Sequence, residues 1–290
     1  MLEAVPNVSE GRDASVIATI GNAFSSSARL LDVHSDEDHH RSVFTLVGET
    51  GALVDALVAG IAAARDLIDL RRHDGVHPRV GAADVVPVVP IVKGDLDAAR
   101  DAALEVARRT GLEVGLPVFL YGELAGGIPP AFLRRGGLRE LERRIRAGEL
   151  TPDFGPQRVD PRSGVVLVGA RRPLVAYNIE LATDDVALAQ EVAVAVRESS
   201  GGLPSVQAIG LRLPRSGRVQ VSMNVLDVER TPLHEAVAAV VGEARERRVV
   251  AGLGELVGLV PASVLAAAEE AGVELDGVDE TRVLERLAAL

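Results

Sequence analysis

The chain has 290 residues, a length that suits one large domain or two of ordinary size. Its composition is 47% hydrophobic but only 2% aromatic, so the core must be built from many small aliphatic side chains. The absence of cysteine excludes disulfides, a thiol nucleophile and thiolate metal sites, and the net charge of -11 argues against a general role in binding nucleic acid.

The sequence also lacks membrane and export signals. No apolar run is long enough to cross a bilayer, and the first residues, MLEAVPNVSEGRD, lack the charged and then apolar layout of a secretory signal. We therefore expect a cytoplasmic protein without a membrane partner.

Apolar periodicity predicts alternating strands and helices in the first half of the chain. The expected strands are residues 2–11, 29–35, 41–48, 81–91 and 117–124, and the expected helices are residues 12–26, 50–68 and 95–111.

The second half repeats the order of the first four strands and two helices. Its expected strands are residues 173–181, 205–213, 218–227 and 249–258, and its expected helices are residues 184–199 and 231–247. This repeat predicts an α+β fold made of two tandem ferredoxin-like (βαββαβ) α/β-sandwich subdomains, residues 1–172 and 173–290. Between the halves, residues 148–164 are rich in Pro, Gly and charge, which is typical of a linker or of a functional loop.

The stretch HSDEDHHRSV, residues 34–43, places three histidines and three carboxylates within seven positions. Strand alternation puts Leu31 and Val33 on one face and Asp32 and His34 on the other, away from the aliphatic core. A metal site completed by His73 and His77 is one interpretation. The irregular ligand spacing instead favours a solvated or substrate-facing turn that holds no structural metal.

A second polar stretch, RRHDGVHPRVGAADVVP, spans residues 71–87. It places two histidines and three arginines within nine residues, so a histidine could act as a general base beside anion-binding guanidinium groups. A solvated loop is the alternative interpretation.

Seven segments together give the sequence a family resemblance. They are VPNVSEGRD, RRHDGVHPRVGAADV, VFLYGE, IRAGE, PDFGP, VGARRPLVAYN and VQVSMN. Their order and approximate spacing resemble those of the formiminotransferase domain family over nearly the whole chain. The ordered set is far more specific than any one segment.

The resemblance implies two α/β subdomains with a ligand cleft between them, and an enzyme whose partners are small molecules. The implied reaction moves a formimino group from N-formimino-L-glutamate to tetrahydrofolate, a co-substrate, in histidine degradation. It requires no metal. A homodimer is also expected.

The resemblance also implies site residues. His77 occupies the histidine of the family's GEHPR motif, here GVHPR, and His34 lies where animal members carry a catalytic-site aspartate. The family's folate-binding loop corresponds to Gly155, Pro156, Gln157, Arg158, Val159, Asp160, Pro161, Arg162, Ser163 and Gly164. Further substrate or folate contacts are expected from Arg41, His39, His40, Arg79 and Arg171.

Three alternatives remain open at this stage. The same folate site could transfer a formyl unit or handle 5-formyltetrahydrofolate. A metal-dependent hydrolase would use the histidines at positions 34, 39, 40, 73 and 77. A protein that only binds folate, without turnover, is the third alternative.

Overall fold

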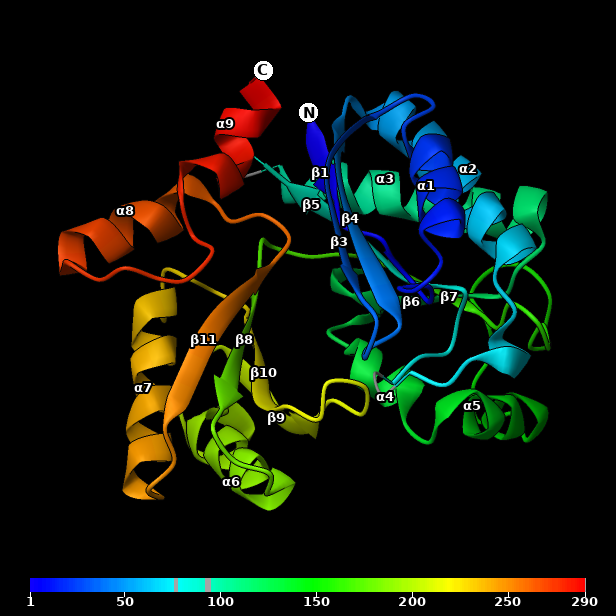
Figure 1. The fold of residues 1–290 in the computed structure, drawn as a ribbon. Coiled ribbons are helices and arrows are strands. Elements are labelled where there is room, and N and C mark those ends of the chain that lie inside the picture. Colours follow the sequence, from blue (N-terminus) through cyan, green and yellow to red (C-terminus); the bar gives the residue numbers. More distant parts are fainter. Residues whose placement is uncertain (76–77, 92–94, 290) are drawn as a thin grey trace. The chain divides into compact units, whose positions relative to one another are not determined.

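The computed structural model describes residues 1–75, 78–91 and 95–289. The chain divides into two compact units, residues 1–171 (unit 1) and residues 172–290 (unit 2). Figure 1 labels their helices and strands along the chain.

The described part of unit 1 contains seven strands. They are β1 (Leu2–Ala4), β2 (Asn7–Val8), β3 (Arg29–Asp36), β4 (Arg41–Gly48), β5 (Ala83–Pro90), β6 (Val118–Gly122) and β7 (Val166–Ala170). Its helices are α1 (Ala14–Phe24), α2 (Thr50–Leu67), α3 (Leu96–Arg109), α4 (Pro130–Arg134) and α5 (Gly137–Arg146), and a π-helical turn, Thr110–Val114, follows α3.

Unit 2 contains β8 (Val175–Leu181), α6 (Val186–Val196), β9 (Val206–Arg212), β10 (Val219–Val225), α7 (Leu233–Glu246), β11 (Ala251–Val257), α8 (Ala262–Ala271) and α9 (Leu284–Ala289). Helices α1 and α6 occupy equivalent places in the two units, and each begins at an aspartate cap. Asp13 accepts the backbone N–H of Ser15 at 2.9 Å, and Asp185 accepts that of Ala187 at 2.9 Å.

The same strand order recurs in both units. In unit 1, β1 and β2 both pair with β4 and β5, so they are two halves of one strand that is interrupted around Pro6. The order β5, β1/β2, β4, β3 in unit 1 therefore matches β11, β8, β10, β9 in unit 2. This confirms the predicted βαββαβ repeat. In unit 1 the sheet continues from β5 through two parallel strands, β7 and β6.

One face of the first sheet packs on α1, α2 and α3, and residues such as Phe44, Leu46 and Val88 point into that core. Val33 pairs with Phe44 on this face, and His34 pairs with Val43 on the other. The prediction that His34 faces away from the aliphatic core is therefore confirmed. A β-bulge between Leu30 and Asp32 interrupts the strict alternation expected at residue 31.

The opposite face of the first sheet carries a second, smaller core beside α4 and α5. It includes Phe119, Tyr121 and Leu167 from the strands, with Leu133 and Leu141 from the helices. Unit 2 has a core of its own between its sheet and helices α6 and α7.

Two sequence-based expectations need correction. Residues 148–164 do not connect the two units, because they lead into β7, which lies between β5 and β6 inside the first sheet. Five elements were also not predicted from the sequence: β7, α4, α5, α8 and α9. None of the helices within the described ranges is long and apolar enough to span a membrane.

Candidate functional site

Three segments of unit 1 meet at the turn end of the β3–β4 hairpin. Ser42 donates its hydroxyl to the carbonyl of Glu10 at 2.6 Å, and the N–H of Gly11 donates to Nδ1 of His40 at 3.1 Å. The loop that begins at His73 packs on the same turn, with its imidazole stacked on that of His40 at 4.0 Å between ring centroids. The two histidine-bearing stretches that the sequence singled out are thus adjacent.

His73 is hydrogen-bonded to the backbone and lies beside the charged Arg79. Its Nε2 is 3.1 Å from the carbonyl of His40, and its Nδ1 accepts the N–H of Gly75 at 3.2 Å. Burial lowers the pKa of His73, and the nearby Arg79 charge lowers it further, to about 4. Burial also lowers the pKa of His40. Both imidazoles are therefore neutral at pH 7.

Arg79 fastens the loop to the hairpin. Its Nη2 donates to the carbonyl of His39 at 2.8 Å, and its Nη1 donates to that of His40 at 3.1 Å and lies against the His73 ring. Gly75 fits beneath these groups only because it lacks a side chain, since a Cβ there would lie 2.4 Å from the His39 carbonyl oxygen.

Ion pairs and hydrogen bonds stabilise the same turn. Arg12 donates from Nη1 to Asp74 at 2.5 Å and from Nε to the carbonyl of Glu37 at 2.9 Å. Asp36 accepts the N–H of His39 at 2.6 Å and lies 3.1 Å from its Nδ1. Burial raises the pKa of Asp36, but the contacts with His39 outweigh it and bring that pKa to about 2.

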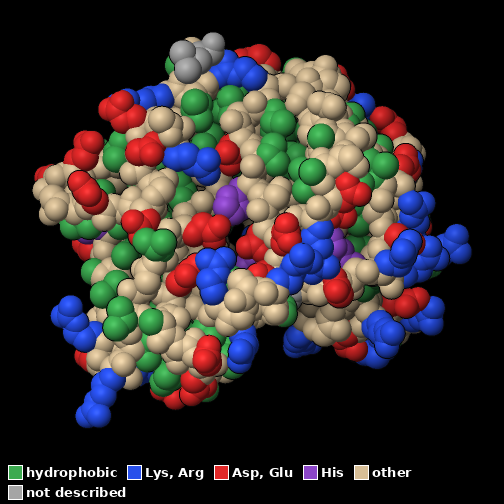
Figure 2. Space-filling model, viewed as in Figure 1, with side chains coloured by type: hydrophobic (Ala, Val, Ile, Leu, Met, Phe, Trp, Pro, Cys, Tyr) green, Lys and Arg blue, Asp and Glu red, His purple; other side chains and the backbone are tan. Residues whose placement is uncertain are grey.

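The turn is more enclosed than the sequence suggested. Asp38 and His39 are 8% and 5% exposed, so the expectation of a solvated turn is wrong for these two residues. On the face drawn in Figure 2, acidic and basic side chains are interspersed.

Asp84 and Arg134 belong to the same region, and sequence reasoning missed both. Asp84, 1% exposed, accepts the N–H groups of Val80 and Gly81 on Oδ1, at 2.7 and 3.1 Å, and accepts Nη2 of Arg134 on Oδ2. Arg41 lies within electrostatic range of Asp84 and of Arg134. The string RVGAAD contained a signal for Asp84, because an aspartate after a Gly-containing turn often accepts that turn's N–H groups.

Other predicted site residues lie outside the group of contacts around His40, His73 and Asp84. His34 lies two positions before Asp36 on the same face of β3, about 6–7 Å along the strand. Arg171 follows β7, where its N–H donates to the carbonyl of Val88, and its side chain contacts the buried Tyr121. His77 lies outside the described residues.

The predicted folate loop, residues 155–164, is anchored at its end. Asp160 accepts the N–H groups of Arg162 and Ser163 at 2.9 and 2.6 Å, and Ser163 donates its hydroxyl to the carbonyl of Arg65. Gly164 has a φ of 74° and would place a Cβ 2.1 Å from the carbonyl oxygen of Val80, so glycine is required there. The loop is therefore an ordered part of unit 1.

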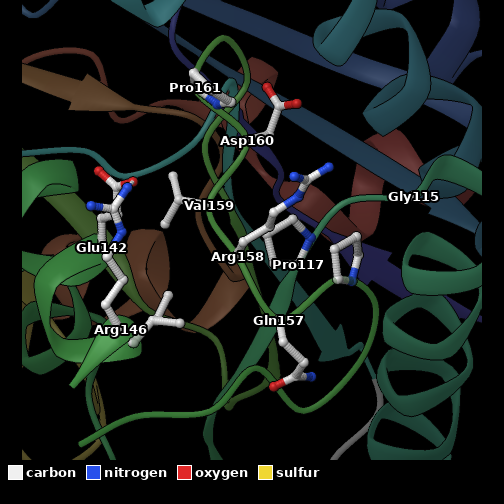
Figure 3. A pocket seen from close by; sticks show the side chains of 11 residues that line it. Gly115, Pro117, Glu142, Arg146, Gln157, Arg158, Val159, Asp160 and Pro161 are labelled. Carbon is white, nitrogen blue, oxygen red and sulfur yellow. Dashed lines mark hydrogen bonds and ion pairs between the residues drawn. The ribbon is translucent and has the colours of Figure 1, made fainter. Parts of the chain in front are cut away.

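A cavity of about 510 Å³ lies beside this loop, a size typical of small-molecule sites. Figure 3 shows the labelled loop residues on one side of it and Glu142 and Arg146 of α5 on the other. Its lining includes Pro156, Gln157, Arg158, Val159, Asp160 and Pro161. Arg162 is not part of the lining and donates instead to the carbonyl of Asp66 at 2.5 Å.

The described side chains do not form a metal site. Residues 1–75, 78–91 and 95–289 contain no group of three or more His, Asp or Glu side chains placed to hold a metal ion. The His39 and His40 side chains instead contact Asp36, Glu10 and the backbone of Gly11.

Comparison with known proteins gives matches along both units. Residues 1–171 match the family described as "Formiminotransferase domain, N-terminal subdomain", and residues 176–277 match "Formiminotransferase domain". A "Glutamate formimidoyltransferase" of Thermoplasma acidophilum is 38% identical over 293 residues, covering 99% of this chain and 96% of the relative.

Two further relatives extend the comparison. A "Glutamate formimidoyltransferase" of Streptococcus pyogenes serotype M1 is 35% identical, covering 96% of this chain and 95% of the relative. A "Formimidoyltransferase-cyclodeaminase" of Gallus gallus is 38% identical, covering 93% of this chain and 52% of that longer relative.

Proposed function

The chain belongs to the formiminotransferase domain family, and from this membership we propose that it transfers a formimino group from N-formimino-L-glutamate to tetrahydrofolate. The products are 5-formiminotetrahydrofolate and glutamate. The observation that carries the proposal is the similarity, along nearly the full length of both chains, to relatives named glutamate formimidoyltransferase.

The reaction is an exchange of amine partners at one carbon. N5 of tetrahydrofolate attacks the formimino carbon, a new C–N bond forms, and the attacking nitrogen must lose a proton. The bond from this carbon to the glutamate nitrogen then breaks, and that nitrogen leaves with a proton as an amine. A single group that first accepts and then returns a proton serves both steps.

We assign that group to His77, and His34 is the second candidate. Supporting this choice, the neighbouring positions of the same loop are firmly held: Arg79 binds two hairpin carbonyls, and Gly75 packs beneath them. His73 is poorly suited to the role, because its ring nitrogens are already engaged with the backbone of His40 and Gly75.

We place the folate beside the loop 155–164. The cavity lined by this loop is large enough for a pterin-sized ligand and carries the exposed Arg158 at its edge. Arg41 and Arg171 remain candidates for binding the carboxylates that the donor and the folate both carry.

Finer aspects of the proposal follow the family as well. We propose that the protein acts in the cytoplasm, in histidine degradation, and as a homodimer. Light scattering coupled to size-exclusion chromatography measures the oligomer directly, and a single monomeric peak at working concentration contradicts the dimer.

The test of function is a comparison of donors. Purified protein is incubated with tetrahydrofolate and either N-formimino-L-glutamate or N-formyl-L-glutamate, and folate products and released glutamate are separated chromatographically. We expect equal amounts of 5-formiminotetrahydrofolate and glutamate from the first donor only. Turnover of the formyl donor alone would instead support the related formyl transfer, and no turnover of either would leave a folate-binding protein.

A further inference from the structure

We propose that Arg134 of α4, together with Arg41 and Arg79, forms a carboxylate-binding subsite that holds the amino-acid end of the formimino donor. These three residues are called the arginine cluster below. The inference rests on the proposed function and adds to it a specificity-determining residue, Arg134, outside the segments that carry the family resemblance.

Asp84 brings the arginine cluster together. It lies at the start of β5, where two backbone N–H groups fix one carboxylate oxygen and Arg134 donates to the other. Arg41 and Arg79 interact electrostatically with both Asp84 and Arg134. Figure 1 shows α4 near the turn end of the β3–β4 hairpin, where Arg41 begins β4.

The three guanidinium groups lie close enough to repel one another. Asp84 offsets part of this repulsion, and it is already paired with Arg134. The nearby Arg12 is paired with Asp74 at 2.5 Å. Burial, with neighbouring positive charge, lowers the pKa of Arg41 and of Arg79 to about 10, which indicates a region that favours an added negative charge.

Arg134 also retains hydrogen-bonding capacity. Its Nε is buried and has no hydrogen-bond partner among the described residues, although its side chain is 14% exposed. A buried donor without a partner is unfavourable, and a carboxylate is the acceptor whose geometry best matches the guanidinium group. An anionic ligand would satisfy both the charge and the donor.

The donor is a better occupant than the folate tail. The arginine cluster adjoins the 73–79 loop, to which we assign the proton-transfer residue, and it shares no residue with the cavity beside the loop 155–164. N-Formimino-L-glutamate is small and carries two carboxylates close to the reacting nitrogen, so it needs positive charge near the site of proton transfer.

The test variant is Arg134→Gln, with Arg135→Gln as the matched control, because Arg135 is the next residue and is exposed. We expect the KM for N-formimino-L-glutamate and the calorimetric Kd for L-glutamate to rise about 10–100-fold, the value of a charge-assisted hydrogen bond. The KM for tetrahydrofolate should change less than about twofold, and Arg134→Lys should recover part of the affinity.

Loss of the ion pair could also disturb folding, so a second variant removes both charges. Asp84→Asn combined with Arg134→Gln removes both members of the ion pair, so neither member is left as an unpaired buried charge, and the variant should fold while still losing glutamate affinity. Unchanged donor and glutamate binding in the folded variants would overturn the proposal, and so would a loss confined to tetrahydrofolate, which would assign the subsite to the folate tail. Lack of activity in the unmodified protein would instead reject the proposed function itself.

Discussion

The imidazole rings of His73 and His40 stack on each other, and the pKa of each is lowered by burial. The His73 ring is half-buried, faces Arg79 and His40, and has its nitrogens in contact with backbone groups. The adjacent acids are Asp74, whose carboxylate is paired with Arg12, and Glu10, which lies 3.4 Å from Nδ1 of His40 and is outweighed there by burial. The folded state therefore prefers neutral imidazoles, and this preference links stability to pH.

The pKa of His73 is about 4 in the folded protein, compared with an ordinary value of about 6.5. Its stabilising contribution is complete above pH 6.5 and is lost as the pH falls toward 4. We expect the free energy of unfolding to drop between pH 7.5 and pH 5 by about 1 kcal/mol more in the unmodified protein than in His73→Gln, allowing for solvent screening.

Urea unfolding at the two pH values measures this difference. Asp36 does not interfere, because its depressed pKa of about 2 affects stability only below its ordinary range. An equal pH response in both proteins would contradict the neutral state assigned to His73.

Gly75 provides a separate test of the packing between loop and hairpin. A Cβ at this position would lie 2.4 Å from the His39 carbonyl oxygen and 2.7 Å from the His40 Cβ. We expect Gly75→Ala to lower the free energy of unfolding by about 1–3 kcal/mol, as overpacking usually does. The matched control is Gly51→Ala in α2, where a Cβ meets nothing within 4 Å. Similar unfolding midpoints for both variants would show that the loop is not packed as described.

At the scale of elements, the sequence predicted the βαββαβ repeat well, because its strands and helices alternate with clear periods. It did not predict β7, for a physical reason. This strand lies between two parallel neighbours, and its residues alternate between two cores, so Val166 and Leu167 are both buried. A short strand buried on both faces has no alternating pattern and is hard to recognise from periodicity.

The candidate site, like the fold, could be predicted from the sequence only in part. The hairpin and the loop after α2 were recognisable by composition and motif, and the structure stacks His73 on His40. The pairing of Asp84 with Arg134 was not recognisable, because the two residues are 50 positions apart and only the fold makes them partners. Arg79 and Arg162 were predicted to contact the substrate or the folate. The structure adds what the sequence could not show, which is that each of them donates hydrogen bonds to backbone carbonyls.

The loop 155–164 provides a matched pair of arginines. Arg158 lines the cavity and is exposed, and Arg162 donates to the carbonyl of Asp66. We expect Arg158→Gln to weaken tetrahydrofolate binding by about 3–10-fold, as loss of an exposed ionic contact would. Arg162→Gln should leave this affinity within about twofold. Equilibrium binding of tetrahydrofolate to both variants provides the measurement, and the reverse ranking would move the anionic end of the folate away from this cavity.

At the scale of the whole molecule, two units with separate cores repeat one strand order, and each of them matches a part of the same family. Unit 1 contains the turn of the β3–β4 hairpin with His39 and His40, the arginine cluster and the cavity beside the predicted folate loop. We therefore propose that proton transfer, which we assign to His77, and folate binding both take place in unit 1.

Turnover by the His77→Ala variant tests this account most directly. The variant and the unmodified protein are assayed with N-formimino-L-glutamate and tetrahydrofolate, and tetrahydrofolate affinity and unfolding midpoint are measured on the same samples. We predict that kcat falls about 10²–10⁴-fold, the usual contribution of general acid–base catalysis, with folate affinity and stability nearly unchanged. Nearly normal turnover in a folded variant would contradict the account and would move the proton-transfer role to another residue, with His34 the first to test.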